Sequence, residues 1–174
     1  MNTDKLELYI SEAEIQEKIK EYAQKLNAIY QGKTLHCVGI MNGALFFMSD
    51  LLRHLDTFIV MDTISVLSYL DGKSTDKIVF NKHITKTITG QDVLLIEDII
   101  DTGKTLDVVV EELKKLKPAS LRIVCLADKP DCHPKPRFEY DYLFALKNEF
   151  VVGYGFDYND KYRQLKGIYI YKVE

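Results

Sequence analysis

The chain has 174 residues, of which 47% are hydrophobic and 28% are charged. This length predicts one domain, spanning residues 1–174, that is large enough to bury a substantial core. The formal net charge of −3 argues against a nucleic-acid partner or an anionic membrane surface, because both require clustered excess base. The chain shows no signal-peptide pattern and no run of membrane-spanning length, so we expect a cytoplasmic protein without a membrane partner.

The first third of the chain predicts two strands and two helices. Residues 6–10 alternate as in a strand, and Ser11 with Glu14 forms a capping box for a helix through about Tyr30. The apolar run 34–40 predicts a buried strand. A turn at Met41-Asn42-Gly43 then leads into an apolar helix from about residue 44 to 55.

The next segment predicts a long hairpin. Residues 58–68 and 77–84 both alternate in a β-rich pattern, and the polar stretch between them contains Gly72. We expect the tip, roughly 68–77, to be a flexible loop. A mobile loop beside an active site can close over it and exclude water. The pattern alone is equally compatible with a simple hairpin turn.

The segment 93–106 carries the most chemistry. Four apolar residues predict a buried strand, and the carboxylates of Glu97, Asp98 and Asp101 follow within five positions. Buried acids need a cation or hydroxyl donors. The turn 102–105 offers backbone amides, two hydroxyls and a helix N-terminus to an anion. A phosphorylated sugar is the ligand that this combination predicts, although a strand-to-helix turn with solvated acids remains the alternative.

A nucleoside-triphosphate P-loop is excluded by spacing. Gly103-Lys104-Thr105 resembles the end of that motif, but the motif requires a glycine five residues before Gly103, where this chain has Asp98.

The rest of the chain predicts a parallel sheet. A helix follows to about residue 116, and strands are expected at 120–127, within 138–146 and at 167–173. Strands that alternate with helices place ligands at the carboxyl ends of the strands. We therefore expect the loops after Ile40, Ile96 and Ala127 to converge. Cys125, Cys132 and His133 lack the paired spacing of a zinc site.

The segment Glu97-Asp98-Ile99-Ile100-Asp101-Thr102-Gly103-Lys104-Thr105 resembles the phosphoribosyl-pyrophosphate signature of type I phosphoribosyltransferases, in the form of their 6-oxopurine branch. Residues 148–158 are similar to the purine-binding hood of that branch. The resemblance implies an α/β fold with a central parallel sheet flanked by helices. It also implies a core of roughly 11–147 and a small hood built from roughly 1–10 and 148–174.

The resemblance also implies residue roles. Asp101 is expected to be the catalytic general base at the purine N7, and Glu97 and Asp98 to position the ribose hydroxyls. Mg²⁺ is the expected cofactor, with Asp157, Glu97 and Asp98 as its protein ligands. The other expected substrate-binding residues are Met41, Asn42, Gly43 and Arg163 at pyrophosphate, Ser68 and Tyr69 in the closing loop, Thr102, Gly103, Lys104 and Thr105 at the 5′-phosphate, and Lys129, Phe150, Val151 and Phe156 at the base.

One of these positions departs from the family pattern. Asn42 stands where Lys or Arg is usual, which weakens any role for a side-chain charge on pyrophosphate, although Asn can still donate a hydrogen bond. Alone, Asn42-Gly43 is simply a turn signal.

The implied reaction joins phosphoribosyl pyrophosphate to hypoxanthine, with guanine as a second expected base. Two alternatives stay open at this point: a xanthine-preferring enzyme, and a non-catalytic RNA-binding regulator of the same fold. A homodimer or homotetramer is expected. The apolar helix 44–55 is a candidate interface, but a helix that faces the core would have the same sequence pattern.

Overall fold

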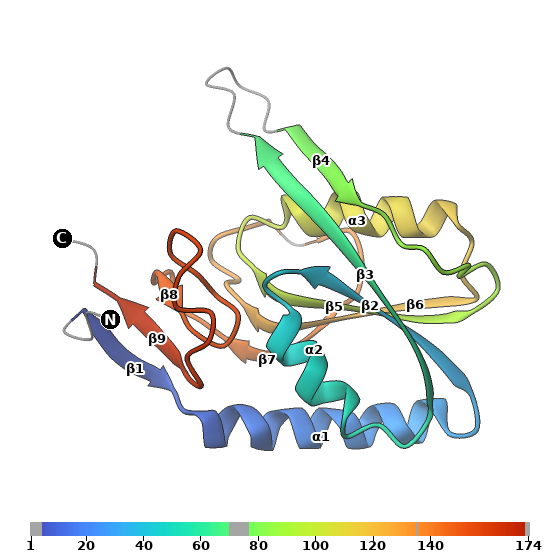
Figure 1. Cartoon of the computed structure of the whole chain (residues 1–174), viewed down its shortest axis with the longest axis horizontal. Helices are drawn as coiled ribbons and strands as arrows, with labels where there is room; N and C mark the ends of the chain where they lie inside the picture. Colours follow the sequence, from blue (N-terminus) through green and yellow to red (C-terminus); the bar gives the residue numbers. More distant parts are fainter. Residues whose placement is uncertain (1–4, 70–76, 135, 173–174) are drawn as a thin grey trace.

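A six-stranded sheet is the framework of the protein (Figure 1). The computed structural model describes residues 5–69, 77–134 and 136–172. Across the sheet the strands follow the order β4 (Lys77–Lys82), β3 (Phe58–Tyr69), β2 (Thr34–Met41), β5 (Asp92–Ile100), β6 (Ser120–Asp128) and β7 (Asp141–Ala145). Neighbouring strands from β3 to β7 pair in parallel, and β4 pairs with β3 antiparallel. The expected parallel sheet is confirmed.

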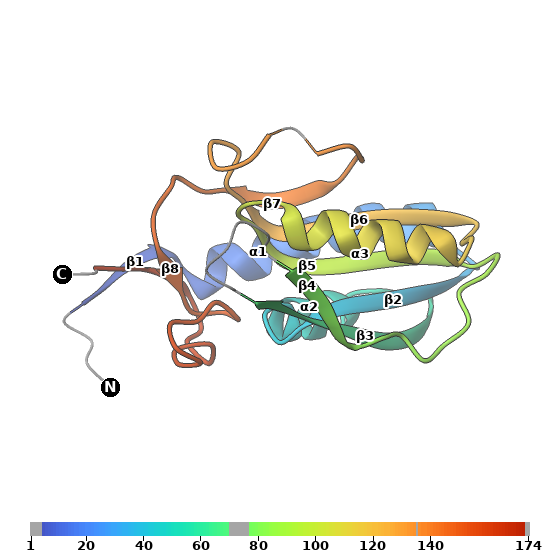
Figure 2. The ribbon, with the colours of Figure 1, turned by 90° about the horizontal axis from the view of Figure 1, so that it is seen from above.

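Helices cover both faces of this sheet, as Figure 2 shows from above. On one face lie α1 (Glu12–Tyr30) and α2 (Leu45–Leu52), and on the other lies α3 (Lys104–Lys115). Successive side chains of β5 alternate between the two cores, with Leu94 and Ile96 in one and Val93 and Leu95 in the other. A strand buried on both faces has to be apolar at every position, which explains the continuous run at 93–96.

The capping box predicted for α1 is present, because the Ser11 hydroxyl accepts the Glu14 amide while the Glu14 side chain accepts the Ser11 amide. α2 is shorter than expected: it ends at Leu52 rather than near residue 55. The side-chain amide of Asn27 explains the early end, because it donates to the His54 carbonyl and accepts from the Asp56 amide. These two bonds turn the chain toward β3.

The central strand is longer than the sequence indicates. β5 was expected to end at Ile96, but it continues to Ile100, and Ile99 pairs with Ala127 of β6. Glu97 and Asp98 therefore lie within the strand and not in the loop after it. Backbone pairing with β6, which continues after the pairing with β2 has ended at Ile96, outweighs the low strand propensity of acidic residues at these positions.

A second, three-stranded sheet forms the hood. Its order is β1 (Leu6–Ile10), β9 (Ile168–Tyr171) and β8 (Val151–Val152), all antiparallel, so that both ends of the chain contribute. Figure 1 shows the hood on the side to which the arrowheads of β5, β6 and β7 point. The sheet of terminal segments thus faces the carboxyl ends of the central strands.

The predicted hairpin is also confirmed, since β3 and β4 pair as far as Tyr69 opposite Lys77. The tip of the expected closing loop, 70–76, lies outside the described residues, as do the side chains of Ser68 and Tyr69. Within the part of the chain that is described, no helix is long and apolar enough to cross a membrane.

Candidate active site

Two adjoining cavities lie where β5 ends. The first, of about 290 Å³, is lined by Met41 at the end of β2, by Gly43 after it, by residues 97–103, by Thr105 of α3 and by Arg163 of the hood. The second, of about 170 Å³, is lined by Lys129, Phe150, Val151, Phe156 and Asp157. Asp98, Ile99 and Asp101 line both cavities. The loops after β2, β5 and β6 therefore converge as expected.

The acidic pair at the end of β5 is held in an unfavourable setting. Glu97 is only 5% exposed, and its Oε1 accepts the Asp98 amide at 2.9 Å. Burial, together with the neighbouring Asp98 carboxylate, raises the pKa of Glu97. Carboxylates in such surroundings are stabilised by hydroxyl donors or by a cation. The pair is thus a candidate site for either.

The turn after β5 is a candidate anion site. Gly103 is the N-cap of α3 with a φ of 74°, a left-handed conformation that glycine adopts without strain. Thr102, Gly103 and Thr105 line the first cavity at the N-terminus of this helix, where amide donors and the helix dipole favour negative charge. Lys104 and Asn42 are exposed and lie outside the lining of both cavities.

Two glycines let three segments meet here. A Cβ on Gly43 would lie 1.8 Å from Oδ2 of Asp98, and a Cβ on Gly155 would lie 2.1 Å from the Gly43 carbonyl oxygen. Gly155 also has a φ of 107°. The turn after β2 is therefore packed between the acidic pair of β5 and the hood. Within that turn, the peptide bond from Met41 to Asn42 is cis.

The second cavity offers an aromatic slot with a cation. Lys129 is 6% exposed, and its Nζ lies 3.7 Å from Oδ2 of Asp101. Phe150 is 44% exposed, whereas Phe156 is buried. The ring of Phe150 meets Tyr158 edge-to-face at 5.7 Å. Flat apolar surfaces beside a compact cation suit a planar heterocycle that carries an oxygen.

Arg163 and Asp157 form an ion pair at the mouth of the site. Nη2 of Arg163 lies 2.7 Å from Oδ1 of Asp157, and its Nη1 donates to the Gly155 carbonyl at 2.7 Å. Among the described residues, no group of three His, Cys, Asp or Glu side chains could hold a metal ion.

Sequence analysis missed the bonds that hold the hood loop. The Tyr154 hydroxyl donates to Oδ2 of Asp50 at 2.5 Å, and Nε2 of Gln16 donates to the same oxygen at 2.6 Å. Tyr154, with a φ of 49°, is one of several non-glycine residues of the hood loop in the left-handed region, which is a mark of functional segments. No sequence pattern links Tyr154 to a helix more than 100 positions earlier.

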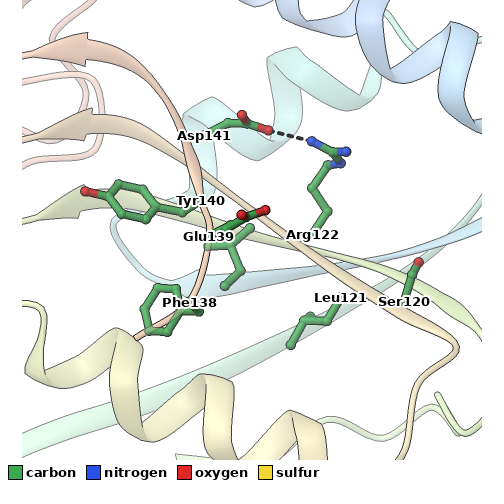
Figure 3. A pocket seen from close by; sticks show the side chains of 8 residues that line it. Ser120, Leu121, Arg122, Phe138, Glu139, Tyr140 and Asp141 are labelled. Carbon is green, nitrogen blue, oxygen red and sulfur yellow. Dashed lines mark hydrogen bonds and ion pairs between the residues drawn. The ribbon is translucent and has the colours of Figure 1, made fainter. Parts of the chain in front are cut away.

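A larger cavity, of about 530 Å³, lies beside the amino-terminal half of β6 (Figure 3). Its only cation among the described lining residues is already paired, because Arg122 Nη1 lies 2.8 Å from Oδ2 of Asp141, and the Tyr22 hydroxyl donates to the same carboxylate. It is also remote from the carboxyl ends of the strands. The two smaller cavities are therefore the candidate active site.

Comparison with known proteins agrees with this geometry. Residues 9–159 match the family model of the phosphoribosyl transferase domain. The chain is 44% identical to the bifunctional protein TilS/HprT of Listeria innocua, over 100% of this chain and 27% of that protein, so it spans about a quarter of this relative. It is 43% identical to a hypoxanthine-guanine phosphoribosyltransferase of Staphylococcus aureus, over 100% of this chain and 98% of that protein.

A solved structure gives the same result. The crystal structure of a hypoxanthine phosphoribosyltransferase from Staphylococcus aureus has a TM-score of 0.91 and 41% identity, covering 99% of this chain and 96% of that one. The sequence, the fold and the two adjoining cavities lead to one conclusion: the chain belongs to the phosphoribosyltransferase family, in its hypoxanthine-guanine branch.

Proposed function

We propose that the chain transfers the 5-phosphoribosyl group from phosphoribosyl pyrophosphate to N9 of hypoxanthine, with guanine as a second base, and releases pyrophosphate in purine salvage. One observation carries this proposal. The acidic pair, the anion-binding turn and the aromatic slot border two cavities that share Asp98, Ile99 and Asp101 in their lining. The relatives give no support to a xanthine preference or to an RNA-binding role.

The first cavity would bind the sugar phosphate. Thr102, Gly103, Lys104 and Thr105 would surround the 5′-phosphate through backbone amides and hydroxyls. Glu97 and Asp98 would accept hydrogen bonds from the ribose hydroxyls, which supply the donors that the acidic pair lacks. Met41, Asn42, Gly43 and Arg163 would contact pyrophosphate.

Mg²⁺ fits the carboxylate oxygens of this site. It binds carboxylate oxygens and completes its shell with water and substrate oxygens. Asp157 would hold the ion, with Glu97 and Asp98 contributing directly or through water. When bound, the ion neutralises negative charge on the departing pyrophosphate.

The base would lie in the second cavity between Phe150 and Phe156, with Val151 at its edge and Lys129 donating to O6. The bond from C1 to the pyrophosphate oxygen breaks and its electron pair leaves with pyrophosphate. The N9 lone pair forms the new bond to C1, and Asp101 takes the proton from N7. Ser68 and Tyr69 would belong to the loop that shields the site from water.

The assembly and its location are further parts of the proposal. The buried face of α2 belongs to the core through Phe47, Met48 and Leu51. A homodimer or homotetramer would cover exposed apolar residues such as Leu45 on the other side of α2, which is 51% exposed, and Phe58 at the start of β3, which is 81% exposed. Light scattering tests this, and a monomer at micromolar concentration would contradict it. Three free cysteines fit the reducing cytoplasm.

The test of the reaction is pyrophosphate release from phosphoribosyl pyrophosphate and Mg²⁺ with hypoxanthine, guanine, xanthine, adenine or uracil in separate assays. We expect turnover with hypoxanthine and guanine. Turnover with xanthine or uracil alone would contradict the proposed base site but would still support the proposed sugar-phosphate site. If the folded protein shows no turnover with any base, the proposed enzymatic activity is wrong.

A matched pair of lysine variants tests the base site. Lys129→Gln should raise KM for hypoxanthine about tenfold and leave KM for phosphoribosyl pyrophosphate unchanged, because a charge-assisted hydrogen bond to O6 is lost. Lys161→Gln makes the same change at an exposed hood residue and should behave as wild type. Equal KM values for hypoxanthine in the two variants would show that Lys129 does not bind the base.

A further inference from the structure

A buried imidazole–carboxylate pair lies next to Lys129 in the chain, and the proposed reaction does not use it. The side chains of His133 and Asp128 are 3% and 2% exposed, and Nε2 lies 2.8 Å from Oδ1. The Tyr140 hydroxyl donates to the other oxygen of Asp128 at 3.0 Å. In Figure 3 this hydroxyl points away from Ser120 and Leu121, toward the carboxyl end of β6.

The partners of the His133 ring define its protonation. Nδ1 lies 2.9 Å from the Pro134 carbonyl oxygen, which can only accept a hydrogen bond. Nε2 faces Oδ1 of Asp128, whose other oxygen accepts a bond from Tyr140, and an ionised carboxylate can only accept hydrogen bonds. A neutral imidazole has a single N–H, so only the imidazolium makes both contacts. The pair is therefore a buried ion pair.

This ion pair closes the turn that begins with Lys129. The Lys129 amide donates to the Ile100 carbonyl at 3.0 Å, and its carbonyl accepts the Cys132 amide at 2.9 Å. Next along the chain, His133 bonds back to Asp128. The turn also lies close to Gly103, because a Cβ added to Gly103 would lie 4.0 Å from Cβ of His133.

We propose that the His133 imidazolium is a positioning residue that, through Asp128, holds Lys129 in the base slot, and that purine binding weakens when His133 loses its proton. This inference rests on the proposed function, because it takes Lys129 as the base-reading residue. His133 does not touch either cavity. We assign its effect on the base to the backbone of the turn.

The direction of the pH dependence follows from the groups that face the ring. Burial alone would lower the pKa of His133, but the Pro134 carbonyl, Asp128 of β6 and the charge of Asp101 after β5 outweigh it and raise the pKa. Burial and the bond to Asp128 raise the pKa of Tyr140, which stays a neutral donor. The ion pair is complete below pH 6.5, the ordinary histidine pKa, and is lost as pH rises through the raised value.

The kinetic test compares His133→Gln with a matched control, His83→Gln. Glutamine can donate a hydrogen bond but carries no charge, and His83 is exposed on the ring of Phe80. At each pH from 5.5 to 9, KM is measured for hypoxanthine and for phosphoribosyl pyrophosphate. Ratios to wild type are used, because ionisation of the substrates affects every variant equally.

We expect the hypoxanthine KM ratio of His133→Gln to be about ten at low pH, as for loss of one charge-assisted hydrogen bond, and to approach one at high pH. The ratio for phosphoribosyl pyrophosphate and both ratios of His83→Gln should stay near one. A hypoxanthine ratio that does not change with pH would overturn the proposal, because a purely structural defect has no reason to follow the His133 titration.

A nuclear magnetic resonance titration of the histidine ring nitrogens provides a test that needs no activity. The His133 signals are identified by their loss in His133→Gln or, if that variant does not fold, by their shift in Tyr140→Phe. We expect an imidazolium at pH 7, and a higher pKa in Tyr140→Phe because Asp128 loses a donor. A neutral ring at pH 7 would overturn the inference, whereas an inactive wild-type enzyme with a charged His133 would overturn only the proposed function.

Discussion

Gly155→Ala puts a methyl group where the protein has no room. The added Cβ would lie 2.1 Å from the Gly43 carbonyl oxygen, and the residue has a φ of 107°. The backbone conformation costs about 1–3 kcal/mol for a residue with a side chain. Forcing a methyl group into a packed contact costs about 1–3 kcal/mol more. The free energy of unfolding should therefore fall by about 2–6 kcal/mol, and Tm by roughly 4–24 °C for a chain of this size.

Gly90→Ala is the matched control. Gly90 has a φ of 71°, but no atom lies within 4 Å of its Cβ position, so only the backbone cost of about 1–2 kcal/mol applies. Calorimetry of wild type and both variants gives the difference due to the contact. A Gly155→Ala protein as stable as Gly90→Ala would refute the close packing of the hood on the turn after β2.

Three further predictions concern the same site. Gly43→Ala should push the Asp98 carboxylate aside, since the new Cβ would lie 1.8 Å from Oδ2. As a result, kcat/KM for phosphoribosyl pyrophosphate should fall about 100-fold, and unchanged kinetics would contradict this prediction. Asp101→Ala should lower turnover about 10²–10⁴-fold, measured by steady-state kinetics, and should weaken purine binding far less, measured by calorimetric titration. Wild-type turnover in this variant would show that Asp101 is not the general base. Burial and the bond to Asp50 raise the pKa of Tyr154, so native protein keeps a proton that the unfolded chain loses above pH 10. Through this residue the free energy of unfolding should fall by about 1.4 kcal/mol per pH unit above pH 10. Denaturant titrations at pH 9–11 should therefore show a shallower fall for Tyr154→Phe than for wild type. Equal slopes would contradict a raised pKa for Tyr154.

Much of the fold could be predicted because its signals are local. The apolar run 93–96, the capping box at Ser11 and the alternation at 58–68 each identify an element from a few neighbouring residues. The convergence of the loops after β2, β5 and β6 follows from parallel pairing alone, since the carboxyl ends of parallel strands meet at one edge. The acids and the glycine turn could therefore be placed beside Lys129 without coordinates.

The remaining features depend on contacts between distant segments. Acidic residues suggested that β5 ends at Ile96, yet pairing with β6 carries it to Ile100. The early end of α2 depends on Asn27, a residue of another helix. His133 was considered only as a zinc ligand, because nothing in its spacing from Asp128 shows that the two side chains meet in the interior.

The packing of the site bears on how it binds substrate. Asp98 lies against Gly43, the Gly43 carbonyl lies against Gly155, and the Gly155 carbonyl accepts a bond from Arg163. The acids that would bind ribose and the arginine that would contact pyrophosphate are thus joined by direct contacts. The acids lie on β5, and Arg163 is held by its contacts with Asp157 and the Gly155 carbonyl, so little conformational entropy is left to lose there when phosphoribosyl pyrophosphate binds. The loss of conformational entropy on substrate binding should then come mainly from the cavity proposed for the base. There Phe150 is partly exposed, and the position of Lys129 depends on the turn closed by His133.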